Sequence, residues 1–249
     1  MAVRAARELH DGDVVFVGIG LPNLACNLAR ATHAPGLVLI YESGAVGAVP
    51  DRLPVSIGDP ALVTGSLAVA SMADVFQFYL QGGRIQVGFL GGAQIDRYGN
   101  INSTVIGPYD RPKVRLPGSG GACEIAIHAE RVIVVAPLSP RSFPATVDFI
   151  TSPGQNGKYG SRQALRLPGR GPVRVVTDVG ILEPSQADGE LELVALYPGV
   201  DAESVMKKAG WPLRVAPTVT VLPPPTQAEL QLLRDVLDPN HLYIGKRDA

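Results

Sequence analysis

The stretch VVFVGIGLPNLACNLARA, residues 14–31, contains the start of an α/β unit. Val14 to Val17 form a continuous apolar run, which is the pattern of a strand buried on both faces. A Gly-rich turn, Gly18 to Asn23, follows this run, and residues 24–31 are helical in composition. Strand, turn and helix in this order open a βαβ unit, so the stretch predicts an α/β fold.

Apolar runs and helical segments continue to alternate along the chain, which predicts a mostly parallel sheet flanked by helices. We predict further strands over residues 37–41, 85–90, 131–136, 173–177 and 191–196, and helices over residues 3–10, 71–80, 123–129 and 228–237. The last two strands are expected to be antiparallel partners at the edge. No boundary is visible before Pro223, so we expect one domain over residues 1–222. Residues 223–249 are expected to form a Pro-rich linker and a C-terminal helix that packs on this domain.

The composition excludes several classes of protein. With 249 residues, of which 46% are hydrophobic and 18% charged, the chain can bury a large core, which excludes disorder. The net charge of −1 offers no basic excess for nucleic acid or an anionic membrane. The first residues lack a signal-peptide pattern and no apolar run reaches the ~20 residues of a membrane span, so we expect a cytoplasmic protein.

Cysteine and histidine usage predicts neither a disulfide framework nor a metal site. The two cysteines, Cys26 and Cys123, are far apart in sequence and are expected to be buried, reduced thiols. The four histidines show no metal-ligand spacing. The chain contains 28 glycines and 22 prolines, which predicts many turns and places where the backbone approaches other groups closely.

Glu42 is the first candidate catalytic residue. It follows the predicted strand 37–41 at its carboxyl end, where open α/β sheets bind their ligands. The small residues after it, beginning with Ser43 and Gly44, leave room for a substrate. An ordinary glutamate is ionised at pH 7, so it needs no partner base to act as a nucleophile. The alternative from the residues alone is that Glu42 caps a helix beginning at Ser43.

A second Gly-rich loop, Gly118-Ser119-Gly120-Gly121, precedes the predicted helix 123–129. Its N–H groups could hold an anion, or the oxygen of a thioester as it becomes negative. The alternative is an ordinary turn. The earlier turn at 18–23 has neither the third glycine of a dinucleotide fingerprint nor the lysine of a P-loop, and no G-x-S-x-G elbow is present. Asp96 and Asn102 flank a turn and are expected to cap it.

Seven segments together resemble the class I CoA-transferases, and within them the B (β) subunit of the glutaconate branch. The segments are VGIGLPNLA (17–25), YESG (41–44), GGAQIDRYGNINST (91–104), RLPGSGGACEIA (115–126), FITSPG (149–154), RQALRLPG (162–169) and VVTDVGIL (175–182). They follow the family's order and cover nearly the whole chain. The 3-oxoacid and 3-oxoadipate branches carry S-E-N-G and G-M-G-G-A-M-D instead of YESG and GSGGACE. A branch of ring-cleavage CoA hydrolases lacks the glutamate.

The resemblance implies a NagB/RpiA/CoA-transferase-like fold and a particular set of site residues. It implies that Glu42 is the catalytic glutamate and that the loop 118–121 serves the oxyanion and CoA. Coenzyme A would pass from an acyl-CoA donor to a carboxylic acid, with a dicarboxylate such as glutaconate as one candidate, through a glutamyl anhydride and a glutamyl-CoA thioester. CoA is then a substrate, and no permanently bound cofactor or metal is expected. The predicted pocket residues are Gly20, Ser43, Gly44 and Gln94.

The resemblance also implies a partner, because the family works with two homologous subunits and this chain matches only the B type. We expect an obligate A-type subunit in a hetero-oligomer, completing the pockets for CoA and the acid. Arg52 and Arg141 are candidate cations for a dicarboxylate, although solvated surface arginine is the better default for both. Two alternatives stay open: an acyl-CoA hydrolase of the same fold, and a non-catalytic ligand-binding α/β protein.

Overall fold

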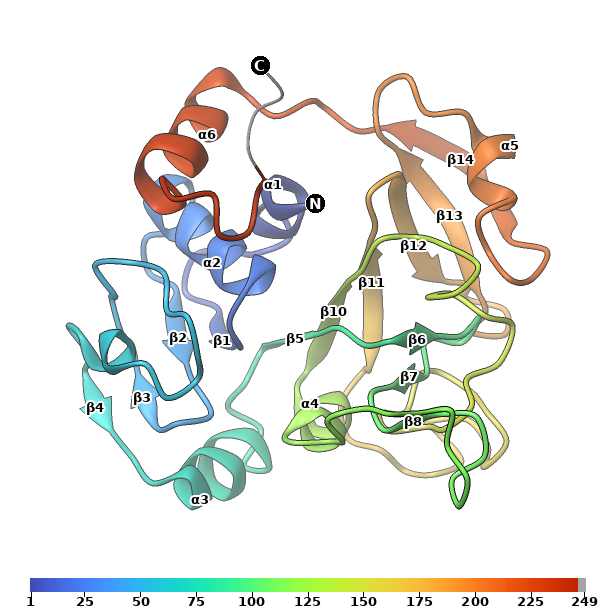
Figure 1. Ribbon diagram of the computed structural model, residues 1–249, viewed down its shortest axis with the longest axis horizontal. Coiled ribbons are helices and arrows are strands. Elements are labelled where there is room, and N and C mark those ends of the chain that lie inside the picture. Colours follow the sequence, from blue (N-terminus) through green and yellow to red (C-terminus); the bar gives the residue numbers. More distant parts are fainter. Residues whose placement is uncertain (246–249) are drawn as a thin grey trace. The chain divides into compact units, whose positions relative to one another are not determined.

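The computed structural model describes residues 1–245, and the chain divides into two compact units (Figure 1). The first unit contains residues 1–89 together with the segment that begins at Pro225, and the second contains residues 90–224. No feature of the sequence marks the junction at residues 89 and 90, whereas the later junction falls within Pro223 to Pro225. Within residues 1–245, no helix has the length and apolar character needed to cross a membrane.

The first unit is built on parallel pairing around its first strand. Its elements are α1 (Ala2–Ala6), β1 (Val14–Phe16), α2 (Leu21–Thr32), β2 (Val38–Ile40), β3 (Ala45–Val46), a 3-10 helix (Pro60–Val63), β4 (Ala68–Val69), α3 (Met72–Asp74) continued by a π-helix (Val75–Leu80), β5 (Val87–Leu90), and α6 (Gln227–Gln231) continued by a π-helix (Leu232–Leu237). The strand order is β5-β1-β2-β3-β4. β1 pairs in parallel with β2 and β5, whereas β3 and β4 are antiparallel additions.

Helix α2 is buried on all sides over its central two turns. Residues 23–29 are all buried, and the helix contacts both α1 and the closing π-helix of the chain (Figure 1). Arg7 after α1 donates to both carboxylate oxygens of Glu229 in α6, at 2.9 and 2.6 Å. The C-terminal helix therefore returns to the N-terminal helices.

The second unit contains a mixed sheet and two small hairpins. Its elements are β6 (Gln94–Ile95), β7 (Ile101–Asn102), β8 (Val105–Ile106), β9 (Val114–Arg115), α4 (Ala122–His128), β10 (Arg131–Val135), β11 (Pro172–Val176), β12 (Gly180–Pro184), β13 (Leu191–Leu196), α5 (Ala202–Met206) and β14 (Arg214–Val221). The sheet order is β10-β11-β12-β13-β14. β10 pairs in parallel with β11, as β13 does with β14, and β12 is antiparallel to both of its neighbours. β6 pairs with β7, and β8 with β9.

The predicted α/β fold is confirmed, and the late strands need correction. β13 is not an edge strand, because β14 pairs with it, and β11 lies between β10 and β12. Neither β12 nor β14 was predicted. β12, GILEP, is bounded by glycine and proline and shows no alternation. β14 alternates only over its last four residues, Thr-Val-Thr-Val, and the Pro217 before them argues against a strand.

Candidate active site

Glu42 lies in the tight turn between β2 and β3. The Gly44 N–H donates to the Tyr41 carbonyl at 2.9 Å and the Tyr41 N–H donates to the Ala45 carbonyl at 3.0 Å, which closes the turn. No helix begins at Ser43, so the helix-capping alternative is wrong. Glu42 is half-buried and Ser43 is exposed. Within residues 1–245 the Glu42 carboxylate makes no hydrogen bond or ion pair, so both of its oxygens are available to a ligand.

Gly44 is the residue that allows this turn to pack against β4. Its φ is +109°, and a β-carbon at this position would lie 2.0 Å from the carbonyl oxygen of Ala70. The Ala70 N–H donates to the Gly44 carbonyl at 2.9 Å, so the two backbones are in direct contact. Only glycine combines this φ with so close an approach.

Behind the turn, the Tyr41 side chain points away from solvent into the unit. It is fully buried, and its hydroxyl accepts a hydrogen bond from Asn23 Nδ2 at 2.6 Å. Burial raises the pKa of Tyr41 to about 12, so the hydroxyl stays protonated at neutral pH. Sequence reasoning missed both residues. The available signals were an asparagine within an apolar helical run and a tyrosine at the end of an apolar strand.

Gly20 stands at the start of α2, in the same unit as Glu42. It is the N-cap residue with a φ of +87°, and the nearest atom to a β-carbon there would be in the Tyr243 ring, at 3.9 Å. The Tyr243 hydroxyl donates to the Pro54 carbonyl at 3.0 Å. A β-carbon at Gly20 would be in ordinary van der Waals contact with Tyr243 and Pro22, and the pocket role of Gly20 stays a prediction.

The loop 118–121 leaves backbone donors without partners. Gly118 and Gly120 have φ values of +103° and +46°. Ser103 holds the loop at one point, since its carbonyl accepts from the Gly118 N–H and its hydroxyl donates to the Gly118 carbonyl, both at 2.8 Å. The N–H groups of Gly120 and Gly121 donate to no atom within residues 1–245. The loop can therefore offer two adjacent donors to an anionic oxygen.

Gln94 is buried and cross-links its surroundings. Its Oε1 accepts from Asn102 Nδ2 at 2.7 Å and from the Asp148 N–H at 3.0 Å, and its Nε2 donates to Asp148 Oδ2 at 3.0 Å. One hydrogen of Nε2 remains for a ligand. The pocket role of Gln94 stays a prediction, whereas its structural role is evident.

Asp96 and Asn102 cap turns, as predicted. Asp96 Oδ1 accepts from the N–H groups of Tyr98 and Asn100, and Asn102 Oδ1 accepts from the Thr104 N–H. Burial raises the pKa of the Asp96 carboxyl despite these hydrogen bonds.

The candidate residues therefore form two groups. Gly20 and residues 42–44 belong to the first unit, whereas Gln94 and residues 118–121 belong to the second. Both cysteines are free, with Cys26 buried and Cys123 half-buried. Across residues 1–245, no three His, Cys, Asp or Glu side chains are grouped as metal ligands would be.

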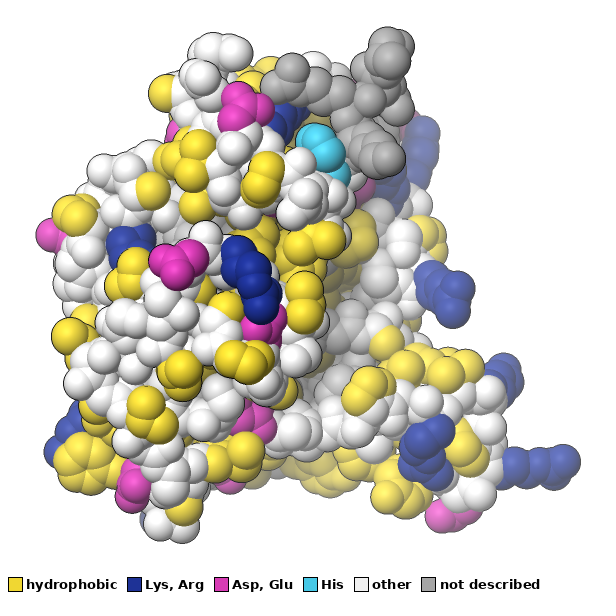
Figure 2. Space-filling view, turned by 60° about the vertical axis from the view of Figure 1, so that its left-hand side comes forward, with side chains coloured by type: hydrophobic (Ala, Val, Ile, Leu, Met, Phe, Trp, Pro, Cys, Tyr) yellow, Lys and Arg dark blue, Asp and Glu magenta, His cyan; other side chains and the backbone are white. Residues whose placement is uncertain are grey.

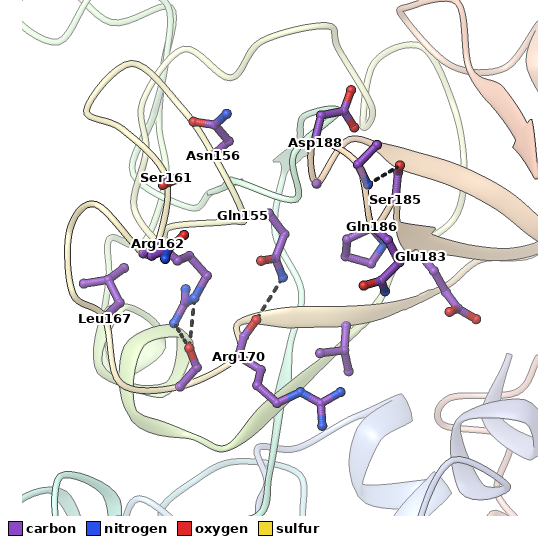
Figure 3. Close-up of a pocket in the computed structure, with 16 residues that line it drawn as sticks. Gln155, Asn156, Ser161, Arg162, Leu167, Arg170, Glu183, Ser185, Gln186 and Asp188 are labelled. Carbon is purple, nitrogen blue, oxygen red and sulfur yellow. Dashed lines mark hydrogen bonds between the residues drawn. The ribbon is translucent and has the colours of Figure 1, made fainter.

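A hollow of about 780 Å³ on the second unit contains none of these candidates (Figure 3). Arg162 in its wall is turned toward the protein, donating to the carbonyls of Gly169 and Ala126 at 2.9 Å each. Burial lowers the pKa of Arg162 to about 10, so it remains charged at neutral pH. Because the Arg162 guanidinium is hydrogen-bonded to main-chain carbonyls, its role is structural. The hollow contributes no residue to the candidate site.

Of the two candidate cations, Arg52 is already paired. Its Nη1 and Nη2 donate to the two carboxylate oxygens of Asp59 at 2.7 and 2.8 Å. Asp59 also accepts from the N–H groups of Val55 and Ala61, at 3.0 Å each. These hydrogen bonds, that of Arg52 first, hold the pKa of the Asp59 carboxyl well below its usual range. Arg52 thus closes a loop, while Arg141 is exposed and has no partner within residues 1–245.

We expect Asp59→Asn to lower the urea-unfolding midpoint at pH 7. The folded pKa is depressed, so the ionised carboxylate stabilises the folded state above the unfolded pKa of about 3.9. That stabilisation is lost as the pH falls from there toward the folded pKa. The difference in midpoint between wild type and variant should therefore be full at pH 7 and shrink below about pH 4. Asp51→Asn is the control, because it makes the same change at an exposed neighbouring carboxylate. If the midpoints of wild type and Asp59→Asn differ as much below about pH 4 as at pH 7, the prediction is contradicted.

Comparison with known proteins shows similarity over nearly the whole chain. A family described as "Coenzyme A transferase" matches residues 1–208. The chain is 51% identical to the B subunit of the 3-oxoadipate CoA-transferase of Pseudomonas knackmussii, over 94% of this chain and 90% of that protein. It is 38% identical to the B subunit of the glutaconate CoA-transferase of Acidaminococcus fermentans, over 98% and 92%. The crystal structure of the A. fermentans glutaconate CoA-transferase superposes with a TM-score of 0.90 at 36% identity, covering 98% of this chain and 95% of that one.

The two relatives differ in the acid that their names contain. Identity is higher to the relative named for 3-oxoadipate, although the motifs at residues 41–44 and 118–124 favour the glutaconate branch. These short motifs therefore do not establish the acid.

Proposed function

The chain belongs to the coenzyme A transferase family and is a CoA-transferase of the B-subunit type, and we propose that its chemistry depends on the carboxylate of Glu42. The observation that carries this proposal is the placement of Glu42 in a glycine-dependent turn at the end of β2, with no internal partner for its carboxylate within residues 1–245. An unpartnered carboxylate beside small residues suits covalent catalysis better than a structural role.

In the proposed first half-reaction, a Glu42 carboxylate oxygen attacks the thioester carbonyl of the donor acyl-CoA. The carbon–sulfur bond breaks, CoA leaves as a thiolate, and an acyl–glutamyl anhydride remains. The thiolate then attacks the glutamyl carbonyl, releasing the donor acid and leaving a glutamyl-CoA thioester. We propose that the N–H groups of Gly120 and Gly121 stabilise the oxyanions of these steps.

The second half-reaction is the reverse with a different acid. The acceptor carboxylate attacks the glutamyl thioester and displaces CoA thiolate, giving a second anhydride. The thiolate attacks the acceptor's acyl carbonyl, which releases the new acyl-CoA and restores the Glu42 carboxylate. Binding energy from the distant CoA nucleotide would contribute at the reacting carbonyl.

We propose that an A-type CoA-transferase subunit completes the enzyme, because both relatives are named as the B member of a pair of subunits. Apolar side chains are spread over the face of the first unit that Figure 2 brings forward. Among the apolar side chains of the first unit, several that follow the Glu42 turn in sequence are more than half exposed in the single chain: Val49, Val63, Leu67, Val69 and Met72. Covering such side chains is a favourable contribution to subunit association.

We propose a short dicarboxylic acid as one of the exchanged acids. The two relatives are named for glutaconate and 3-oxoadipate, which are both dicarboxylates. The second carboxylate requires a cation, and because Arg52 is paired with Asp59, Arg141 or a residue of the A-type subunit is the better candidate.

The acceptor requirement tests the function and separates a transferase from a hydrolase. The chain, co-expressed with its A-type subunit, is incubated with an acyl-CoA in the presence and absence of glutaconate, 3-oxoadipate or acetate. We expect a new acyl-CoA to form only when a carboxylate is present, with either dicarboxylate preferred to acetate. Release of free CoA at the same rate without any acceptor would identify a hydrolase instead.

A further inference from the structure

We propose that Tyr41 is a positioning residue for Glu42, and that its buried hydroxyl transmits the position of helix α2 to the catalytic turn. The inference rests on the proposed role of Glu42. All of the observations that carry it come from the first unit.

Tyr41 belongs both to the turn and to the core. Its main-chain carbonyl and N–H make the two hydrogen bonds that close the turn around Glu42, with Gly44 and Ala45. Its side chain is fully buried, and its hydroxyl meets the similarly buried Asn23 in the first turn of α2. A shift of the Tyr41 ring therefore moves the backbone from which Glu42 projects.

The hydroxyl is the first member of a chain of polar groups on one face of α2. Asn23 Oδ1 accepts from Asn27 Nδ2 at 2.8 Å, and Asn27 Oδ1 accepts from Arg30 Nη2 at 2.8 Å. The spacings of four and three residues place these three side chains on the same face of the helix. Arg30 Nη1 then donates to the Ala48 carbonyl at 2.7 Å. The hydrogen-bonded side chains of α2 thus connect Tyr41, before the Glu42 turn, with Ala48, after it.

Stability alone does not account for this arrangement. Apolar side chains of similar volume would fill the same space without the cost of desolvating two amides, and such replacements are often neutral or stabilising. What hydrogen bonds add is direction, because they define one orientation of the Tyr41 ring relative to α2. Nucleophilic catalysis depends on such orientation, since a displacement of about 1 Å can cost on the order of 10²-fold in rate.

The test uses Tyr41→Phe, Asn23→Leu and the double variant, each assembled with the A-type subunit. We measure kcat, the KM for acyl-CoA, the rate of glutamyl-CoA thioester formation by intact mass, and urea unfolding. Tyr41→Phe keeps the ring but removes the hydroxyl, and we expect kcat to fall roughly 10- to 100-fold with KM within about twofold of wild type. In the double variant, unfolding stability should recover relative to Tyr41→Phe, because the buried amide that Tyr41→Phe leaves without its acceptor is removed as well. The kcat should remain low. Asn27 Nδ2 keeps the Asn23 carbonyl as an acceptor at 2.9 Å.

Thr32→Val serves as the control, because it removes a hydroxyl that donates to the Leu28 carbonyl at 2.7 Å near the other end of α2. It should leave kcat unchanged. An unchanged kcat in Tyr41→Phe, or a kcat that recovers together with stability in the double variant, would overturn the positioning role. Failure of the proposed function is distinguished by Glu42→Gln, because full activity in that variant, or no thioester in the wild type, would remove the premise itself.

Discussion

Replacement of Glu42 by glutamine is expected to lower the kcat of the assembled enzyme by roughly 10⁴-fold or more, as loss of other covalent nucleophiles does. The amide is nearly the same size as the carboxylate, but it is neutral and cannot form the anhydride. Because the Glu42 carboxylate makes no hydrogen bond or ion pair within residues 1–245, the substitution removes no stabilising contact of the described chain. The effect should therefore be on chemistry, with the unfolding midpoint unchanged.

Intact-mass analysis measures the same step directly. After incubation with acyl-CoA, the wild-type chain should carry a CoA adduct that borohydride reduces, and Glu42→Gln should carry none. Glu192→Gln is the matched control, because it makes the same chemical change at a half-buried glutamate on β13. An adduct of wild-type yield on Glu42→Gln would mean that another residue is the nucleophile.

Gly44→Ala is expected to cause the largest loss of stability that a single methyl group can produce in this turn. The φ of +109° is strained for any residue with a β-carbon, and the new methyl would lie 2.0 Å from the Ala70 carbonyl oxygen. The β-carbon is fixed to the backbone of residue 44 and the oxygen belongs to the backbone of Ala70, so no side-chain rotation relieves the contact. β3 and β4 must separate or the turn must change shape. We expect the free energy of unfolding to fall by about 3 kcal/mol or more. The kcat should also fall, because Glu42 moves with the turn.

Gly12→Ala separates the effect of a positive φ from the effect of the contact with Ala70. Gly12 also has a positive φ, +83°, but a β-carbon there would meet nothing within 4 Å. It should therefore show only the backbone strain, about 1 kcal/mol, with kcat unchanged. Urea unfolding of the two variants gives the comparison. Equal losses would show that contact with Ala70 does not determine the conformation of the turn.

The first β-α-β segment could be predicted because its local signals agree with its tertiary role. The runs at 14–17 and 37–41 are apolar without interruption, as strands covered on both faces are, and both became parallel strands. β12 and β14 lacked such signals. β14 has a short Thr-Val-Thr-Val alternation, but Pro217 interrupts the strand and most of it is exposed, so its pairing with β13 was not evident from the sequence.

The candidate site shows the same division. Glu42 could be singled out because it ends an apolar strand and precedes small residues, and these features are local. The contact of this turn with Ala70 could not be seen, because the Ala70 backbone approaches Gly44 from a different part of the chain. The contact between Tyr41 and Asn23 could not be predicted either, since nothing in the sequence indicates that these two residues, 18 positions apart, form a hydrogen bond.

The α/β class and the family could be read from the sequence alone, because apolar periodicity and motif order are properties of the linear chain. The same linear features made Glu42 and the loop 118–121 candidate site residues. Three features became visible in the folded chain alone. The Glu42 turn contacts Ala70 after β4 and Asn23 in α2, Gln94 and Arg52 are hydrogen-bonded internally, and the chain divides after Phe89. Hydrogen bonds and close backbone contacts depend on where distant segments meet, whereas hydrophobic patterning specifies which face is buried but not which polar groups meet there.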